Sequence, residues 1–480
     1  DAYAHAWANF SQRTFVRVDP PYIEWYQARH GVKLDRSFVL PVLKAIQGHP
    51  EAGRLWEEHI NKILFSKELK FTTTTHDHCI YRTVFNDEEV FLLRQTDDFA
   101  ISCKNEATAI AIFDIIGKKL QLRNEDSPPF DYFGQLVDFN GVEVNQFQEY
   151  IGMSCSGYID RIVRSHGWDK DPTFGNTTDR PTSPLPDNCI HQLYESFIGT
   201  EGGGFKEGTK QHKDLEDEMG FAYRTVLGEL MFAYVCCRLD IAYAVTTLSK
   251  FSTCPTRLHY QYLVGVVKYL HRTRHWGIRY HRICKSSEYH SSLPPGDYTD
   301  IPPPLPDFFK AFPSTDPTVL TCFVDAAYAN DPRKRRSTTG YALMMAGGAV
   351  VYRSKTQAVT ALSSTEAEFF AAVAVAKVIL YLRSVLRELH LPMTAPTTIY
   401  EDNEACIKII NSDHPTDRTR HIDTPFFRVM DWRKRGDLRL KHIAGIMNPA
   451  DSHSKPTGWV LHTRNCRRMM GHYNNTTDSP

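Results

Sequence analysis

Hydrophobic and polar positions along the chain follow a helical period in some stretches and alternate in others, and this pattern divides the chain into blocks. The first block, residues 1–165, mixes both periods. Helices are predicted over 51–65 and 105–120, and short strands over 89–93, 99–103 and 140–144. The second block, residues 217–282, is predicted to be mostly helical, with apolar positions at helical spacing in 225–250 and 259–272.

The last block, residues 319–470, alternates between predicted strands and helices. A long helix is expected over 365–390, where apolar residues from Val378 to Leu389 mark one face. Strands are predicted over 319–324, 341–345, 349–353, 397–401 and 438–443, with further helices near 403–411 and 422–434.

Two polar, proline-containing stretches separate the blocks. Residues 166–215 hold four prolines and the run Gly202–Gly204, and their aperiodic pattern predicts a loop or insertion. Residues 286–318 hold eight prolines and are predicted to form an extended linker. The predicted domains are therefore 1–165, 166–285 (the insertion loop plus a helical region), 286–318 (the linker), 319–470 and a tail, 471–480.

Composition and charge narrow the class of protein. The 480 residues are 42% hydrophobic and 23% charged, which is typical of folded domains rather than of disorder. Lys+Arg and Asp+Glu both number 56, and this zero net charge argues against a histone-like binder. Residues 321–480 carry 22 basic and 15 acidic residues, a net of +7, so the C-terminal part is expected to have a polyanionic partner.

No secretory or membrane segment is expected, because charged residues interrupt each apolar run before the roughly 18–20 residues that a span needs. The 11 cysteines are an odd number without CxxC spacing, which predicts reduced thiols in an intracellular protein. The sequence begins with Asp1 rather than methionine, so we expect a piece of a polyprotein.

Four acidic residues in the last block follow predicted strands or turns, or lie on the long helix. They are Asp325 in TCFVDAAYAN, Glu368 in SSTEAEFFAAV, Asp402 in TIYEDNEA and Asp451 in NPADSHSK. Acids at strand ends and on a facing helix can converge on one point, where they repel unless cations neutralise them. Such a group suits two magnesium ions and phosphodiester cleavage. The alternative, for any one acid alone, is a solvated cap or loop residue.

The first block holds a pair of adjacent acids. Asp97 and Asp98, in FLLRQTDDFAISC, lie between two apolar runs. This arrangement predicts a hairpin whose tip presents two carboxylates. Such a pair can hold the metal ions of a nucleotidyl transferase, although Asp-Asp turns are also common on protein surfaces.

The order of short sequence words resembles one family. The words VDAAYANDPRKRRSTTGY, VYRSKTQAVTALSSTEAEFFAA, IYEDNEACI, RTRHID and NPADSHSK resemble the RNase H domain of copia-type long-terminal-repeat retrotransposon Pol polyproteins. The words LDRSFVLPVLKAIQGHPEAGRLWEEHI, LLRQTDDFAIS, FNGVEV and SGYIDRIV resemble the reverse transcriptase of the same family. The resemblance implies an α+β reverse transcriptase palm and fingers with a helical thumb and connection. An α/β RNase H-like domain with a mixed five-stranded sheet is expected to follow.

The resemblance also implies site residues and cofactors. The nuclease site of the family falls on Asp325, Glu368, Asp402 and Asp451, and two of its polymerase metal ligands fall on Asp97 and Asp98. Two Mg²⁺ ions are expected in each active site, with Mn²⁺ as a substitute. Within STEAE, Glu366 is the second candidate for the nuclease glutamate. Glu368 is chosen because the apolar helical run that follows the family's glutamate comes after it.

The chain departs from the family at the polymerase site. The family's hairpin reads Tyr-x-Asp-Asp, whereas Gln95 and Thr96 precede the acids here. The family also has an aspartate at the end of the first palm strand. Aligned on Ala2-Tyr3, that aspartate falls just before residue 1, and Asp1 is the alternative ligand.

Three residues are candidates for binding the incoming nucleotide. Gly48, after Gln47, permits close backbone approach. Arg54 precedes Trp56 by two residues, which matches an Arg-x-Trp of the family and suggests a triphosphate contact. The alternative for Arg54 is a surface arginine of a helix beside a core tryptophan.

Basic words and histidines lie near the nuclease acids. RKRR at 333–336 and RKR at 433–435 are either phosphate contacts along an RNA–DNA hybrid or solvated faces. His442 and His453 lie near Asp451 in the sequence, where a mobile histidine would assist product release and a surface histidine is the alternative.

The sequence therefore predicts RNA-directed DNA synthesis from a primer and hydrolysis of RNA in RNA–DNA hybrids. The expected partners are an RNA template, a DNA primer, the hybrid, dNTPs and other Pol or Gag pieces, without a membrane. The expected location is the cytoplasm, including virus-like particles. The alternatives are a chain with only RNase H activity and a non-enzymatic nucleic-acid-binding relic.

Overall fold

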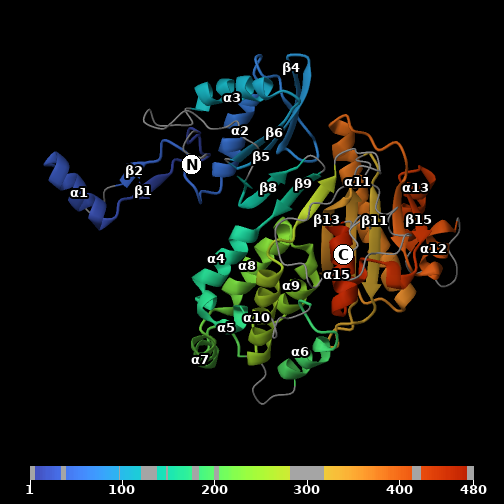
Figure 1. Cartoon of the computed structure of the whole chain (residues 1–480). Helices are drawn as coiled ribbons and strands as arrows, with labels where there is room; N and C mark the ends of the chain where they lie inside the picture. Colours follow the sequence, from blue (N-terminus) through green and yellow to red (C-terminus); the bar gives the residue numbers. More distant parts are fainter. Residues whose placement is uncertain are drawn as a thin grey trace. The chain divides into compact units, whose positions relative to one another are not determined.

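The computed structural model describes residues 6–33, 39–96, 98–120, 138–147, 150–175, 183–198, 205–281, 318–412 and 423–472. The chain forms two compact units, Asp1–Gln135 and Leu136–Pro480 (Figure 1). The predicted linker 286–318, apart from its last residue, and most of the predicted tail lie outside the described residues. The predicted domain boundaries stay predictions, and each unit is described by itself.

The described residues of the first unit form two antiparallel sheets and three helices. Strands β1 (Phe15–Arg17) and β2 (Val39–Pro41) pair with each other, and helix α1 (Pro20–His30) lies between them in the sequence. A four-stranded sheet has the order β3-β4-β5-β6, with strands at Thr72–Thr73, Ile80–Phe85, Glu88–Gln95 and Asp98–Ser102. Helices α2 (Ala52–Leu64) and α3 (Glu106–Leu120) confirm the predicted helices 51–65 and 105–120.

The core of the first unit lies between the four-stranded sheet and its two helices. Alternate residues of β5, such as Val90 and Leu92, are buried with Ile112 and Ile116 of α3. The buried carboxylate of Glu88 accepts hydrogen bonds from the Asn105 backbone N–H (2.8 Å) and the Thr108 hydroxyl (2.6 Å). These bonds satisfy donors at the start of α3 and tie that helix to the sheet.

The second unit begins with an antiparallel sheet and a group of helices. The sheet has the order β10-β9-β8-β7, with strands at Ile278–His281, Tyr150–Ser154, Val142–Gln146 and Asp138–Phe139. Strand β10 lies at the end of the block that was predicted to be mostly helical. The helices are α4 (Ser156–Ser165), α5 (Pro172–Gly175), α6 (Cys189–Ile198), α7 (Lys210–Met219), α8 (Tyr223–Cys236), α9 (Ala242–Ser249) and α10 (Arg257–Arg272).

The prediction of a loop over 166–215 is wrong in its described parts, because α5, α6 and most of α7 lie there. Helices α6 and α7 have only ten residues each, and few of these are buried. On α6 the buried residues include Leu193 and Tyr194. Thr209 caps the N-terminus of α7, and Gly220, with φ of 79°, ends it. Ten-residue helices with so few buried positions leave too little apolar periodicity to recognise in the sequence.

The rest of the second unit is a mixed five-stranded sheet with helices, which confirms that element of the predicted fold class. Its order is β13-β12-β11-β14-β15, antiparallel from β13 to β11 and parallel from β11 to β15. The strands are β11 (Thr321–Ala327), β12 (Thr338–Met345), β13 (Gly348–Thr356), β14 (Thr397–Glu401) and β15 (Leu438–His442). The helices are α11 (Ser364–Glu388), α12 (Glu404–Asn411), α13 (Asp423–Lys434), α14 (Asp451–Ser454) and α15 (Trp459–Met469).

Both faces of the five-stranded sheet are covered. Cys322 and Val324 of β11 share one core with α11. Phe323, which lies between them and points to the other face, shares a second core with helices α8–α10 and with α15. The helical block before the predicted linker and the sheet after it therefore form one continuous core (Figure 1).

Helix α11 changes the expectation about membrane segments. Its 25 residues include an 18-residue window with a mean hydropathy of 1.9, so by length and composition it is apolar enough to cross a membrane. Half of that window is buried within the protein. Because Phe369, Val375 and Ile379 pack in the core beneath the sheet, core packing accounts for this apolar composition.

Strand β10 joins the two sheets of the second unit. The His281 N–H donates to the Ala346 carbonyl (2.7 Å), and the Tyr280 hydroxyl donates to the Ala349 carbonyl (2.9 Å). Gly348 permits this approach, because a Cβ there would lie 2.4 Å from the Arg279 carbonyl oxygen.

We expect Gly348→Ala to lower the free energy of unfolding of the second unit by about 1–3 kcal/mol, since an added methyl group must push β10 away from β13. The matched control is Gly228→Ala within α8, where an added Cβ meets nothing within 4 Å. That change should be neutral or stabilise by about 0.5–1 kcal/mol. Denaturant unfolding measures both, and equal midpoints for the two variants would contradict the close approach.

Candidate active sites

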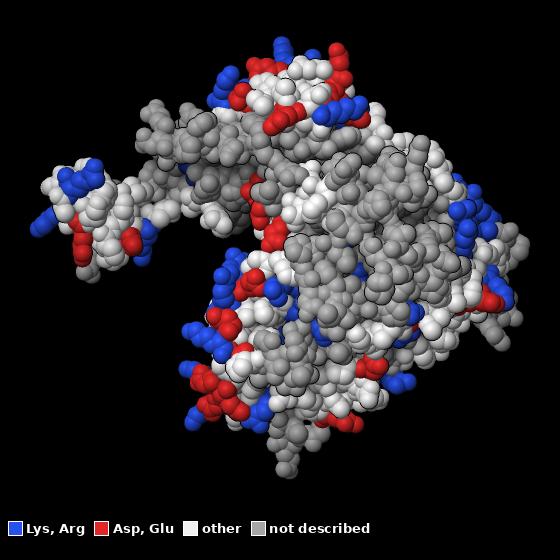
Figure 2. All heavy atoms as spheres, in the orientation of Figure 1, with Lys and Arg blue, Asp and Glu red and all other residues white. Residues whose placement is uncertain are grey.

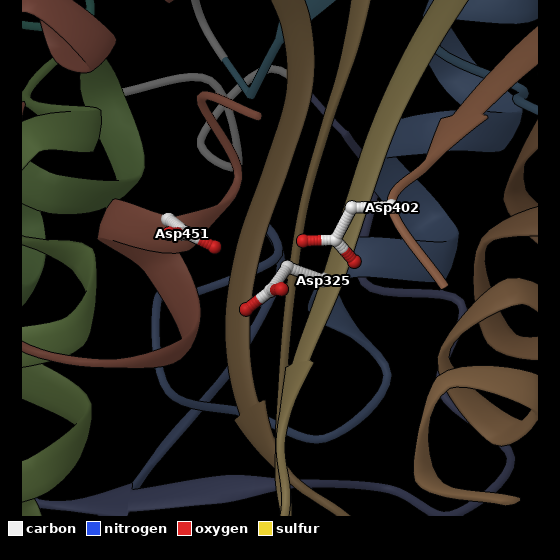
Figure 3. A group of neighbouring side chains, drawn as sticks. All are labelled: Asp325, Asp402 and Asp451. Carbon is white, nitrogen blue, oxygen red and sulfur yellow. The ribbon is translucent and has the colours of Figure 1, made fainter. Parts of the chain in front are cut away.

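Three aspartates meet at one end of the five-stranded sheet. Asp325 lies on β11, Asp402 directly follows β14, and Asp451 begins α14. Carboxylate oxygens of these residues all lie within 4.8 Å of one another, and Figure 3 shows the three side chains close together. Asp325 and Asp451 are buried, whereas Asp402 is half-buried. The structure thus brings together three of the four acids that the sequence singled out.

The fourth acid lies in an adjoining group. Carboxylate oxygens of Glu368, Glu401 and Asp402 also lie within 4.8 Å of one another. Asp402 therefore belongs to both groups and links the predicted Glu368 to the other aspartates. Glu401 is fully buried, and the sequence analysis did not identify it.

Strand geometry explains why Glu401 faces this site. Successive side chains of a strand point to opposite faces of the sheet. On β14, Ile399 lies in the core with α11 and Tyr400 lies in the other core, so Glu401 points toward α11 and Glu368. The IYED pattern contained this signal, because Glu401 is two residues after the apolar Ile399.

Glu366, the competing glutamate, has a different environment. Its Oε2 accepts a hydrogen bond from the Leu362 backbone N–H (2.7 Å) in the turn before α11. The Glu366 N–H donates to the Ser363 hydroxyl that caps the helix (3.2 Å). Glu366 thus contributes to the start of α11, and Glu368, about half a turn later, lies beside the other acids.

Ser454 and Lys455 also contact the aspartates. The Ser454 hydroxyl donates to Asp325 Oδ2. Lys455 Nζ lies 3.0 Å from Asp451 Oδ1 and 3.8 Å from Asp325 Oδ2. Both residues belong to the word NPADSHSK, but the sequence analysis gave them no role. Lys455 supplies the positive charge nearest to these carboxylates among the described ion pairs.

The turn before α14 is fastened to the strand that carries Asp325. The buried Asn448 side chain donates to the Val324 carbonyl (2.8 Å) and accepts from the Ala450 N–H (3.2 Å). Gly445 lies against Asp402, since a Cβ there would be 3.0 Å from Asp402 Oδ2. These contacts hold the backbone on both sides of the site.

Crowding and burial disfavour ionisation of the carboxylates. Burial, followed by the charges of Glu401 and Asp325, raises the pKa of Glu368 to about 11. Burial and Asp325 raise the pKa of Asp451 to about 7, although Lys455 opposes this shift. The pKa of Asp402 is raised by the same two causes, and burial holds the pKa of Glu401 well above its usual range.

The residues present fit divalent cations. Glu368 Oε2 and Glu401 Oε2 are buried and have no hydrogen-bond partner among the described atoms. A buried carboxylate oxygen without a donor is costly unless a cation satisfies it. Because every candidate ligand is a carboxylate oxygen, the donor set suits Mg²⁺ or Mn²⁺. Asp325, Glu368, Asp402 and Asp451 would hold such ions, and Glu401 adds a further oxygen.

The two histidines near Asp451 in the sequence differ from each other. His442 is exposed at the end of β15. His453 is fully buried, and its Nε2 lies 2.9 Å from the Leu239 carbonyl oxygen. Burial lowers the pKa of His453 to about 4. Both expectations for His453, a mobile group and a surface group, are therefore wrong.

The predicted hairpin with the paired aspartates is present, although Asp97 lies outside the described residues. Gln95 of β5 pairs with Asp98, the first residue of β6, which leaves a two-residue connection. Thr96 has φ of 54°, as tight hairpins require. The Trp56 indole N–H donates to the Thr96 carbonyl (2.8 Å), so α2 fixes the hairpin tip.

The candidate nucleotide-binding residues lie at the start of α2 and before it. Gly48 is exposed and has φ of 90°, in the region that favours glycine. Gln47 precedes it in the same exposed turn. Arg54 is exposed on α2 and pairs with Glu58 (2.5 Å) and Glu51 (3.2 Å). These pairs fit the surface interpretation of Arg54, and its triphosphate contact stays a prediction.

Comparisons with known proteins follow the same division of the chain. Residues 18–179 match the family model for reverse transcriptase (RNA-dependent DNA polymerase). The Pol polyprotein of transposon TNT 1-94 from Nicotiana tabacum is 25% identical over 92% of this chain and 28% of the relative. The Pol polyprotein of transposon RE1 from Arabidopsis thaliana is 24% identical over 88% of this chain and 24% of the relative. The chain thus spans about a quarter of these relatives.

A solved structure gives a weaker similarity. LC11-RNase H1, isolated from compost, is 14% identical with a TM-score of 0.23, and the match covers 28% of this chain and 91% of that one. The strand order described above, rather than this similarity, defines the C-terminal fold. The matches to the polyproteins extend over most of the chain. The chain therefore contains a reverse transcriptase domain and, over most of its length, is homologous to Pol polyproteins of copia-type retrotransposons.

Proposed function

We propose that the C-terminal part of this chain hydrolyses the RNA strand of RNA–DNA hybrids with two divalent cations. The observation that carries the proposal is the convergence of Asp325, Glu368, Asp402 and Asp451 at one end of the mixed sheet. A group of buried carboxylates destabilises a fold unless cations neutralise it, so such a group is typical of a functional site. RNase H activity is also what the family resemblance implies for these positions.

The residues at this site have different proposed roles. The cations, when bound, activate water and stabilise the leaving oxygen of the phosphodiester. Asp402 belongs to both oxygen groups, so it would help to hold a cation in either group. Lys455 holds Asp451 and Asp325 by charge, which limits the repulsion between these carboxylates before ions bind. The Ser454 hydroxyl orients Asp325.

Basic side chains near the sheet support a nucleic-acid substrate. In the loop after β11, Asp331 Oδ1 accepts from the N–H groups of Arg333 and Lys334 (3.0 Å each), which shapes the exposed RKRR turn. Lys434 and Arg435 are exposed at the end of α13. Figure 2 shows lysine and arginine side chains gathered where α12, α13 and β15 lie. Phosphate contacts by these groups would explain the net charge of +7.

For the first unit we propose a role in RNA-directed DNA synthesis from a DNA primer. Asp97 and Asp98 would hold Mg²⁺ or Mn²⁺ at the hairpin tip, and Gln47, Gly48 and Arg54 would lie along the path of the dNTP. The support is the family match over residues 18–179 and the hairpin that Trp56 anchors. The alternative of a chain with only nuclease activity remains. Cytoplasmic location, virus-like particles and other Pol or Gag pieces are further proposals.

We expect Asp402→Asn to abolish cleavage of labelled RNA in an RNA–DNA hybrid with magnesium, because the change removes a charge shared by both oxygen groups with little change in volume. A loss of at least about 100-fold is expected. Glu404→Gln is the matched control, since Glu404 is exposed on α12 and pairs only with Lys408 in the described contacts. Undiminished cleavage by Asp402→Asn would contradict the assignment, and Glu366→Gln and Glu368→Gln made separately decide between the two glutamates.

In the metal-free protein, the free energy of unfolding should depend on pH, because folding raises the pKa values of the clustered carboxyl groups. A carboxyl group whose pKa is raised on folding keeps a proton that the unfolded chain has lost, so stability falls as pH rises above about 4. For Asp451, with a pKa of about 7, the fall between pH 6 and 8 should be on the order of 1 kcal/mol. Thermal melts in chelator should show it, and Asp451→Asn or added Mn²⁺ should reduce it. A melting temperature of the metal-free protein that does not change with pH would contradict the raised pKa values of the clustered carboxyl groups.

The polymerase proposal makes its own prediction. Asp98→Asn should abolish primer extension on a homopolymer RNA template in any chain that shows it, because the hairpin would lose a metal ligand. Asp87→Asn is the control, since Asp87 lies in the turn of the neighbouring β4–β5 hairpin with φ of 60°. Extension that survives Asp98→Asn at the control level would remove Asp98 from the site.

A further inference from the structure

Helix α14, which begins with Asp451, has little support from its own length. It has four residues, all buried, and it packs against β11 and β12 on one side and α9 on the other. A helix of one turn has almost no intrinsic stability, so its position is set by what it touches. The other three predicted ligands lie on or directly after long strands, or on the 25-residue α11.

We propose that His453 is a positioning residue that fixes Asp451 by fastening α14 to the helical block of residues 205–281. This inference rests on the nuclease function proposed above. The buried Nε2 of His453 lies 2.9 Å from the carbonyl oxygen of Leu239, a residue 214 positions earlier. A carbonyl only accepts hydrogen bonds, so Nε2 carries the proton and donates it.

The acceptor is itself held rigidly. Leu239 starts the short 3-10 helix η3 (Leu239–Ile241) and is fully buried. On either side of it, Arg238 and Asp240 form a fully buried two-bond ion pair, Nε to Oδ1 at 3.0 Å and Nη2 to Oδ2 at 2.6 Å. The Tyr269 hydroxyl of α10 donates to the same Asp240 Oδ2 (2.8 Å). The Leu239 carbonyl is therefore a fixed point of the helical block.

Two further contacts leave the histidine little freedom. The Tyr352 ring of β13 lies nearly parallel to the His453 ring, at 6.4 Å between centroids. The Tyr352 hydroxyl donates to the Tyr234 carbonyl at the end of α8 (2.9 Å). On the opposite side, a Cβ on Gly340 of β12 would lie 2.7 Å from the His453 carbonyl carbon, so β12 and α14 are in direct backbone contact.

Losing the His453 bond should displace Asp451 most, because Asp451 is the predicted ligand that lies on α14 itself. Without the His453 bond, α14 keeps its packing against β11, β12, β13, α9 and α15 but loses its hydrogen bond to the Leu239 carbonyl of the helical block. Glu368 and Asp402 lie on or next to other elements, and Asp325 lies on β11 and meets α14 through Ser454 and the following Lys455. We therefore expect turnover and cation affinity to fall while binding of the hybrid is kept, because catalytic geometry tolerates little displacement.

The test compares His453→Met with His453→Gln in the full chain. The two new side chains have nearly the same shape, but only glutamine retains an N–H donor. We expect His453→Met to lose about 10–100-fold in hybrid-cleavage turnover, with KM within about threefold, and to need a correspondingly higher Mn²⁺ concentration for half-maximal thermal stabilisation. His453→Gln should remain within about threefold of the wild type in both measurements.

The matched control is His472→Met. His472 is buried, and its Nε2 makes the same kind of bond to a backbone carbonyl before the predicted linker, Gly277 O at 2.6 Å. It lies beyond α15, in a part of the chain to which we assign no ligand. His472→Met should keep wild-type turnover even if its melting temperature falls. Equal losses in the two methionine variants would show a purely structural effect and overturn the proposal.

The remaining outcomes are also decisive. Equal turnover and Mn²⁺ response in His453→Met and His453→Gln would overturn the role of the donor. If His453→Met does not fold, a shift of more than threefold in the Mn²⁺ midpoint of His453→Gln overturns the proposal, and a smaller shift supports it. If the wild type cleaves no hybrid, the proposed function fails, but the Mn²⁺ comparison still tests the positioning of Asp451.

Discussion

The second unit depends on the burial of both faces of its five-stranded sheet. Alternate residues of β11 point into different cores, Val324 toward α11 and Phe323 toward helices α8–α10 and α15. A parallel-containing sheet with two apolar faces cannot leave either face in water. The helices before the proline-rich stretch cover one face, so the predicted connection and the predicted nuclease are structurally a single body.

The cluster of acidic side chains at the end of the five-stranded sheet destabilises the second unit. Burial and neighbouring charges raise the pKa values of Glu368, Glu401, Asp402 and Asp451 at the sheet end. The buried Oε2 atoms of Glu368 and Glu401 also have no hydrogen-bond partner within the described part of the chain. Natural folds keep such groups mainly where function requires them. Among the described contacts, the local compensation comes from Lys455, the Ser454 hydroxyl and the Asn403 backbone N–H, which donates to Glu401 Oε1. The surrounding core must supply the rest.

Many of the helices and strands, and most of the clustered acids, are predictable from the sequence, for reasons that differ between elements. Helix α11 and strands β11 to β15 have long, regular apolar patterns, and all were predicted within about three residues. Strand β10 and helix α6 were missed, because four and ten residues give little periodicity. Glu401 was recoverable from strand alternation, but was overlooked beside Asp402. The burial of His453 was not predictable, since its partner Leu239 is a backbone carbonyl 214 residues earlier, and a carbonyl has no sequence signature.

The core that helices α8–α10 share with the five-stranded sheet also affects folding during synthesis of the chain. Strand β10 is complete at His281, yet that residue's imidazole finds its carbonyl partner only at Gly471, 190 residues later. At about 5–20 residues per second, a ribosome needs roughly 10–40 s to supply those residues. During that time the face of helices α8–α10 that later meets Phe323 and Met344 stays uncovered. A nascent chain of this length should therefore be a good substrate for chaperones, and early termination after residue 281 should yield an aggregation-prone product.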